Sequence, residues 1–99
     1  MRRVLPGDVS AAACVLLAQA AEARPRILAR MLAEAATADA YRLETGRLHP
    51  LWGNGSLRAA ALTRPRADEP YWDDPEYAAC MALVFEALVA RAVPLSARR

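Results

Sequence analysis

The sequence predicts an all-α fold, a single four-helix domain over residues 1–99. Composition is the first reason, since 24 residues are Ala and 13 are Leu, whereas Phe and Ile occur once each. Ala and Leu favour helices, and a sheet would need more β-branched and aromatic residues. The second reason is that helix-starting and helix-ending residues punctuate the apolar segments. The length fits one hydrophobic core, and 56% of the residues are apolar, enough to fill it.

The first two helices are expected to fold back on each other as an N-terminal antiparallel hairpin. The first covers about residues 9–22, with Asp8 as its N-cap. The second covers about residues 25–45, with Pro25 in its first turn and Gly46 just past its end. Only two or three residues would separate these helices, and so short a connection favours an antiparallel pair.

Two further helices follow, each after a loop rich in turn residues. Gly, Pro and Asn-Gly occur within residues 46–55, and Ser56 is then expected to cap a short third helix over about residues 57–62. The fourth helix is expected to start with Asp74 as its cap, followed by a first-turn proline, and to end at about residue 92.

The first and fourth helices are apolar on more than one face. A helix that is apolar all round needs cover on several sides, and four helices of this size cannot supply it for two of them. The excess apolar surface is therefore expected to meet a second subunit. The residues expected in this self-association are Leu16, Val84, Phe85 and Leu88. The alternative is that small alanine side chains simply remain exposed.

All thirteen basic residues are Arg, and against eleven acidic residues they give a net charge of +2. So small a net charge does not by itself imply nucleic-acid binding. Binding to DNA would instead depend on arginines that cluster on one surface. The arginines expected to contact DNA or an acidic partner are Arg2, Arg3, Arg24, Arg26 and Arg30. No helix-turn-helix is legible, so contact with DNA would be weak, non-specific and made to phosphates. Each cluster could instead be an ordinary solvated face.

The loop over residues 46–56 reads Gly-Arg-Leu-His-Pro-Leu-Trp-Gly-Asn-Gly-Ser. It contains His49, the only histidine, which is expected to be structural and to bond an acid such as Asp39. Asp39 falls on the apolar side of the second helix, where a carboxylate needs a partner. That partner is expected to be Arg42, Arg47 or a backbone N–H of the loop.

Large aromatic residues fall on or near the loops. They are Tyr41, Trp52, Tyr71 and Trp72. We expect them to fold under the loops and fasten them to a small core, the alternative being a contact patch. Trp52 is also the residue through which the loop over residues 46–56 would contact a protein partner.

No catalytic, metal or cofactor site is predicted. Cys14 and Cys80 are far apart and lack the paired spacing of a zinc site, so we expect two small buried apolar residues. The acidic run over residues 68–76 fits no calcium loop. A small enzyme that uses Asp39, His49 and Cys14 is the least favoured alternative, since an active site needs convergent titratable groups.

The N-terminus has some features of a signal peptide. It opens on two arginines, continues into an apolar run of eight residues over positions 11–18, and then contains Ala-Gln-Ala. Pro6, Gly7 and Asp8 interrupt the approach to this run, so we expect a helix start and a cytoplasmic protein. The run is too short to cross a membrane.

The chain resembles short proteins of GC-rich bacteria that share the loop over residues 46–56, in the form Gly-Arg-x-His-Pro-x-Trp-Gly-x-Gly-Ser. In its helix plan it is similar to small terminase subunits of phage-derived gene transfer particles. The resemblance implies an all-helical oligomer, often a ring, that helps a large terminase subunit to package DNA. The usual N-terminal DNA-binding domain of that family is not visible here, so specific DNA recognition is not expected.

These observations favour a non-enzymatic, oligomeric helical interaction protein, and most specifically a small terminase-like DNA-packaging adaptor. Its expected partners are copies of itself, a large terminase subunit and DNA phosphates. The alternative is a monomeric protein-binding adaptor or regulator that uses the loop over residues 46–56.

Overall fold

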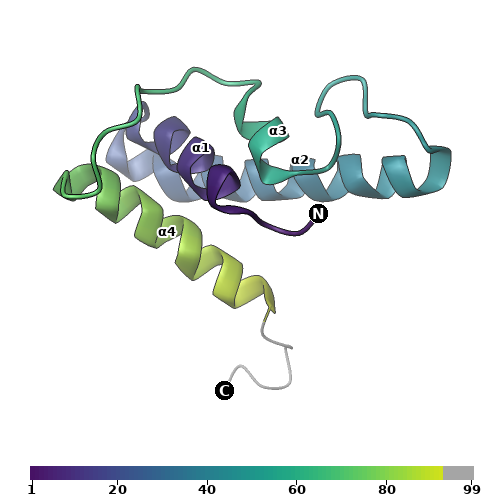
Figure 1. Cartoon of the computed structure of the whole chain (residues 1–99). Helices are drawn as coiled ribbons and strands as arrows, with labels where there is room; N and C mark the ends of the chain where they lie inside the picture. The colour runs from purple at the N-terminus through teal and green to yellow at the C-terminus, as the bar shows by residue number, and fades with distance from the viewer. Residues whose placement is uncertain (93–99) are drawn as a thin grey trace.

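A computed structural model describes residues 1–92 and contains four α-helices and one 3₁₀ turn (Figure 1). The helices are α1 (Pro6–Leu17), α2 (Arg24–Thr45), α3 (Leu57–Ala61) and α4 (Pro75–Ala92), and the turn is η1 (Ala21–Ala23). Residues 1–92 contain no strand. The predicted all-α fold with a short third helix is confirmed, and residues 93–99 of the predicted domain lie outside the described part.

The start of α1 differs from the prediction. Pro6 is the first helical residue and Leu5 the N-cap, so Asp8 lies inside the first turn. Proline suits this position because the first N–H groups of a helix have no partner within it. The prediction of Asp8 as N-cap is therefore wrong. Its buried carboxylate instead accepts the backbone N–H of Leu5 at 2.7 Å and that of Arg58, at the start of α3, at 2.8 Å.

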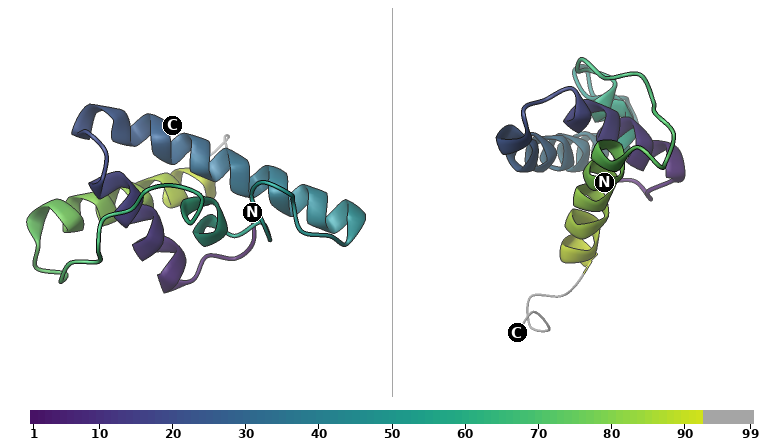
Figure 2. Two further views of the ribbon diagram at one scale, coloured as in Figure 1. Left: turned by 90° about the horizontal axis from the view of Figure 1, so that it is seen from above. Right: turned by 90° about the vertical axis from the view of Figure 1, so that its left-hand side faces the viewer.

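α2 returns along α1 in roughly the opposite direction and crosses it obliquely, which confirms the hairpin (Figures 1 and 2). The connection over residues 18–23 is longer than predicted, because it includes η1. The far end of α2 agrees with the prediction, since Gly46 follows Thr45 with a φ of +73°. A residue with this left-handed backbone conformation ends a helix without steric strain only when it is glycine.

The two predicted caps of the later helices are confirmed. Ser56 Oγ accepts the N–H of Ala59 at 3.0 Å at the start of α3. Asp74 Oδ1 accepts the N–H of Tyr77 at 3.0 Å at the start of α4. Both side chains therefore bond an N–H group that has no partner inside its helix.

The core lies around α1, which packs against α4 and α3 and, less extensively, against α2. Leu16 and Val84, predicted to lie on a self-association surface, are fully buried in this single chain. The prediction for these two residues is corrected, because α1 finds cover from three helices of its own chain. Phe85 remains 55% exposed and Leu88 partly exposed on α4.

Candidate functional site

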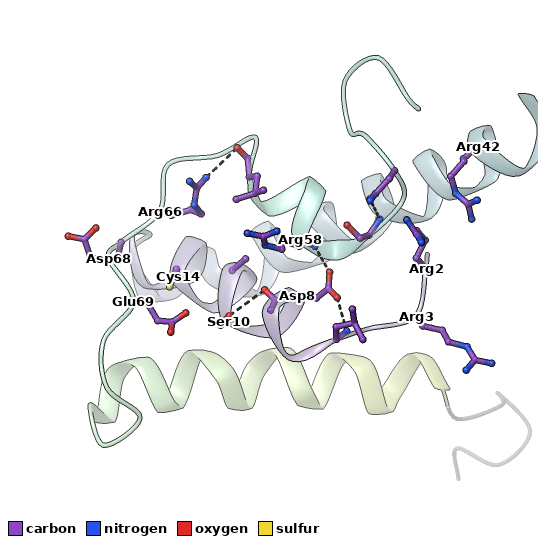
Figure 3. Close-up of a pocket in the computed structure, with 17 residues that line it drawn as sticks. Arg2, Arg3, Asp8, Ser10, Cys14, Arg42, Arg58, Arg66, Asp68 and Glu69 are labelled. Carbon is purple, nitrogen blue, oxygen red and sulfur yellow. Dashed lines mark hydrogen bonds between the residues drawn. The ribbon is translucent and has the colours of Figure 1, made fainter. Parts of the chain in front are cut away.

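A groove of about 1060 Å³ runs along one side of the molecule (Figure 3). Five arginines from four segments line it: Arg2, Arg3, Arg42, Arg58 and Arg66. Figure 3 shows the first three gathered at one end and Arg58 near the middle, whereas Arg66 lies near Asp68 and Glu69 at the other end. The groove therefore has a basic part, called the arginine end below, which extends from Arg2, Arg3 and Arg42 to Arg58, and a mixed end that carries two carboxylates.

Three of these arginines have no partner within the described residues. The guanidinium groups of Arg2, Arg3 and Arg58 are exposed and form neither an ion pair nor a hydrogen bond among residues 1–92. Arg42 Nη2, by contrast, pairs with Asp39 Oδ1 at 2.9 Å. Arg66 donates to two backbone carbonyl oxygens near its own position. The arginines of the groove that have no partner among residues 1–92 are therefore Arg2, Arg3 and Arg58.

The N-terminal segment that carries Arg2 and Arg3 is fastened to the loop and to α2. The N–H of Arg2 donates to the carbonyl oxygen of Gly55 at 2.9 Å, and the terminal ammonium group lies 3.3 Å from Asp39 Oδ2. Gly55 has a φ of +89°, and a Cβ there would lie 2.6 Å from Asp39 Cα. Only glycine lets the loop approach α2 so closely, so Gly55 sets the place of Arg2.

Asp39 has one of its predicted partners. The hydrogen bond from Arg42 lowers the pKa of the Asp39 carboxyl below its usual value, and the terminal ammonium group adds to this effect. Arg47 is exposed and does not bond Asp39, and neither does His49. The predicted His49–Asp39 bond is therefore wrong.

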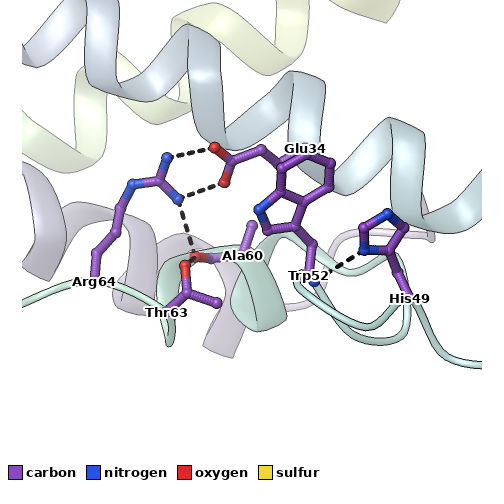
Figure 4. Close-up of polar contacts among 6 residues, drawn as sticks. All are labelled: Glu34, His49, Trp52, Ala60, Thr63 and Arg64. Atoms are coloured by element: carbon purple, nitrogen blue, oxygen red, sulfur yellow. Dashed lines mark hydrogen bonds and ion pairs between the residues drawn. The ribbon is translucent and has the colours of Figure 1, made fainter.

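His49 instead organises its own loop (Figure 4). Its Nδ1 accepts the N–H groups of Leu51 at 3.1 Å and Trp52 at 3.2 Å. Its ring stacks on the Trp52 indole, with ring centroids 4.7 Å apart, and meets the Tyr41 ring edge-on at 5.2 Å. Because Nδ1 already serves two backbone donors, His49 fixes the shape of a turn. Tyr41 and Trp52 thus hold the loop through His49, but neither packs against the hydrophobic core as predicted.

The other two aromatic residues do not behave as predicted. Tyr71 is 87% exposed and Trp72 is 78% exposed, so neither fastens a loop to the core. Their loop is held at its ends, where Ala67 N–H donates to the Cys14 carbonyl oxygen at 3.0 Å and Asp74 N–H to the Tyr71 carbonyl oxygen at 3.1 Å. The intervening residues 68–73 lie on the surface, where all but the half-buried Pro70 are exposed.

Among the arginines predicted to bind a partner, Arg24 is a structural residue. It is buried, and its Nε donates to the Leu16 carbonyl oxygen at 2.7 Å while Nη2 pairs with Glu76 Oε1 at 2.7 Å. The prediction for Arg24 is therefore corrected, since its charge is used inside the chain. Arg26 and Arg30 are exposed on α2, but they do not line the groove.

Sequence reasoning missed an ion pair that fixes the segment after α3 (Figure 4). Arg64 contacts both carboxylate oxygens of Glu34 on α2, at 2.6 and 2.7 Å, and also donates to the Ala60 carbonyl oxygen at 3.2 Å. Paired hydrogen bonds of this kind are stronger and more directional than a single contact. Thirty residues separate the partners, so no local pattern points to them.

Cys14 and Cys80 are free and buried, as predicted for small apolar residues. Burial raises the pKa of both thiols, and it raises the pKa of the neighbouring Tyr77 hydroxyl to about 12. These groups are therefore protonated at neutral pH, and a protonated thiol is a poor nucleophile.

Residues 1–92 hold no group of three or more side chains arranged to bind a metal. None of the helices in this range combines the length and hydropathy needed to span a bilayer.

Comparison with known families gives one result. The profile of the Domain of unknown function (DUF7742) matches residues 2–88, a range that includes every residue lining the groove. Neither the curated proteins nor the solved structures compared with the chain include a match.

Proposed function

Because the chain belongs to the DUF7742 family, whose description names no activity, we propose its function from the geometry of the groove. The protein is a non-enzymatic interaction protein that holds an anionic partner against Arg2, Arg3 and Arg58. One observation carries the proposal: these three arginines, unpaired among residues 1–92, line one groove. Arginine keeps its charge and forms paired hydrogen bonds with phosphate or carboxylate groups.

The charges around the groove define where the anion lies. Asp68 and Glu69 occupy the opposite end and repel phosphate or carboxylate there. The partner is therefore confined to the arginine end. The groove lining includes no aromatic side chain on which a nucleic-acid base could stack. Contacts to a nucleic acid would accordingly involve its backbone and carry no sequence preference.

The most specific form of the proposal is a small terminase-like DNA-packaging adaptor that works in the cytoplasm. In this form DNA phosphates are the anion, copies of the chain form a homo-oligomer, and a large terminase subunit is the protein partner. What supports it is the coincidence of an all-helical chain with an exposed set of arginines suited to phosphate. The resemblance in helix plan is the reason for preferring DNA over other polyanions.

Binding to a short DNA duplex tests the proposal. With three phosphate contacts, the logarithm of the affinity should fall against the logarithm of salt concentration with a slope of about −3. A groove variant that combines Arg2→Gln, Arg3→Gln and Arg58→Gln should lose most of the binding at about 50 mM salt and nearly all of the slope. Fluorescence anisotropy of a labelled duplex provides the measurement.

A charge-matched control separates the groove from net charge. Arg26→Gln, Arg30→Gln and Arg91→Gln also remove three exposed positive charges, none of them from the groove lining. This control should retain the slope. Equal losses in the two triple variants, or no binding by the wild type at low salt, would contradict the proposal.

A second candidate function is favoured by the loop over residues 46–56. The loop is held by the His49 turn, the Trp52 stack and the close approach of Gly55 to α2, yet Leu48 is 65% and Leu51 is 67% exposed. An ordered loop that displays leucines suits a protein partner, because such side chains gain free energy only when something covers them. In this second candidate function, the protein is a monomeric adaptor that binds a protein partner through the loop over residues 46–56.

The leucines provide the test of this candidate. Leu48→Ser with Leu51→Ser should leave the melting temperature within about 2 °C of the wild type, since exposed positions contribute little to stability. The same double change should abolish capture of the partner that wild-type protein retains from a lysate. Unchanged capture by the double variant would exclude the loop as the docking surface.

A further inference from the structure

The loop before α4 presents two aromatic side chains to solvent. Tyr71 and Trp72 are the most exposed large hydrophobic residues in the described part of the chain, at 87% and 78%. The carboxylates of Asp68, Glu69 and Asp73 flank them, and none of these three forms an ion pair or hydrogen bond among residues 1–92. Residues 68–73, called the acidic aromatic loop below, therefore combine apolar area with unpaired negative charge.

The arginine end of the groove carries the opposite charge. Two of its lining residues are exposed leucines, Leu5 at 66% and Leu62 at 45%. They line the same groove as the three unpaired arginines. Leucine side chains can pack on aromatic rings, and a guanidinium group is attracted both to a carboxylate and to an aromatic face. The arginine end is thus complementary in charge to the acidic aromatic loop, and the leucines of the groove offer apolar area to its aromatic rings.

We propose that the acidic aromatic loop of one copy of this chain docks into the arginine end of the groove of a second copy. The inference rests on the proposed function, because the anionic partner held by the groove is here another copy. The loop leading to α4 does not reach the arginine end of its own chain, since Asp68 and Glu69 lie at the opposite end of the groove from Arg2 and Arg3 (Figure 3). The two contacting surfaces differ, so the contact is head to tail and can be repeated from copy to copy.

The numbers of available charges match across this contact. Two other acids of the same region are already used inside the chain, since Asp74 caps α4 and Glu76 pairs with Arg24. Three carboxylates remain in the loop, and three arginines remain unpaired in the groove. Like charges would oppose a contact between two grooves or between two loops, and this favours the head-to-tail arrangement.

Molar mass in solution, measured by light scattering after size exclusion, tests the docking. Wild-type protein should exceed the single-chain mass of 10.7 kDa, and increasingly so with concentration. Raising the salt from about 50 mM to about 200 mM should lower the mass, because screening weakens contacts between exposed charges. A loop variant (Tyr71→Ala with Trp72→Ala) and the groove variant (Arg2→Gln, Arg3→Gln and Arg58→Gln) should each run as a monomer.

A mixture of the two variants gives the sharper test. The loop variant keeps an intact groove, and the groove variant keeps an intact loop, so one productive contact remains between them. Equimolar mixing should give a species of twice the single-chain mass that grows no further. Phe85→Ala with Val89→Ala removes exposed apolar area from α4 instead, and this control should assemble like the wild type.

Several outcomes would overturn the inference. They are a monomeric wild type, assembly by both variants alone, failure of the mixture to pair, and loss of assembly in the α4 control. Binding of the DNA duplex by the loop variant separates the two claims. If the loop variant binds DNA with the wild-type slope while the wild type stays monomeric, the self-docking fails and the proposed function stands. If no variant binds DNA but the mixture forms the paired species, the self-docking stands and the proposal that the groove binds DNA fails.

Discussion

Replacing Gly55 by alanine should destabilise the protein by about 3 kcal/mol, from a left-handed backbone and a steric clash combined. The φ of +89° is strained for any residue with a Cβ, and that Cβ would lie 2.6 Å from both Cα and Cβ of Asp39. The backbone N of Asp39 would lie 2.8 Å away, and this N and the Cα belong to the α2 backbone, which cannot move aside as a flexible side chain would. For a chain of this size, the melting temperature should fall by more than about 10 °C.

Gly46 supplies a matched control for Gly55. Its φ is +73°, but an added Cβ would meet nothing within 4 Å. Gly46→Ala should therefore cost only the left-handed backbone strain, about 1 kcal/mol. Thermal unfolding followed by circular dichroism compares the two variants. Equal losses would mean that the close approach of the loop to α2 does not contribute to stability.

Replacing Asp8 by alanine should cost about 2–4 kcal/mol, because the carboxylate accepts two backbone N–H groups that nothing else can satisfy. These groups belong to Leu5, at the start of α1, and Arg58, at the start of α3. Asp8 is only 4% exposed, so water cannot readily replace it. The loss should appear as a lower urea midpoint with little change in the denaturant slope.

Two further variants define the interpretation of the Asp8 result. Asp8→Asn keeps one acceptor oxygen and should fall between the wild type and Asp8→Ala. Ser10→Ala removes an exposed hydroxyl whose 3.3 Å bond to the Gly7 carbonyl oxygen is marginal, and it should change stability by less than about 0.5 kcal/mol. An Asp8→Ala variant as stable as Ser10→Ala would show that Asp8 does not join α1 to α3.

The helices were largely predictable because their ends carry local signals. Gly46, Ser56 and Asp74 stand where the structure places a helix end or cap. The start of α1 differs from the prediction because Asp8 is a good N-cap residue by type, whereas Pro6 suits the first helical position and the helix begins there. The partner that decides the role of Asp8 lies fifty residues away, so the sequence nearby could not reveal it.

The groove could be predicted only in part. Arg2 and Arg3 stand out because they are adjacent, whereas Arg42, Arg58 and Arg66 come from three other segments that only the packing of the chain brings along one groove. Arg24 stood in a cluster, yet the interior uses its charge. Arginines that lie close together in the sequence therefore indicate exposed charge correctly at Arg2 and Arg3. They do so wrongly at Arg24, because tertiary contacts supply that residue with a partner.

Nuclear magnetic resonance of ¹⁵N-labelled protein, titrated with a short DNA duplex at about 50 mM salt, tests the central claim most directly. The account predicts that the largest shifts occur at the Nε–H groups of Arg2, Arg3 and Arg58 and at backbone amides along the arginine end. Signals from Arg26 and Arg30 should move little. Shifts centred on Arg26 and Arg30, or no shifts anywhere, would contradict an anion-binding groove.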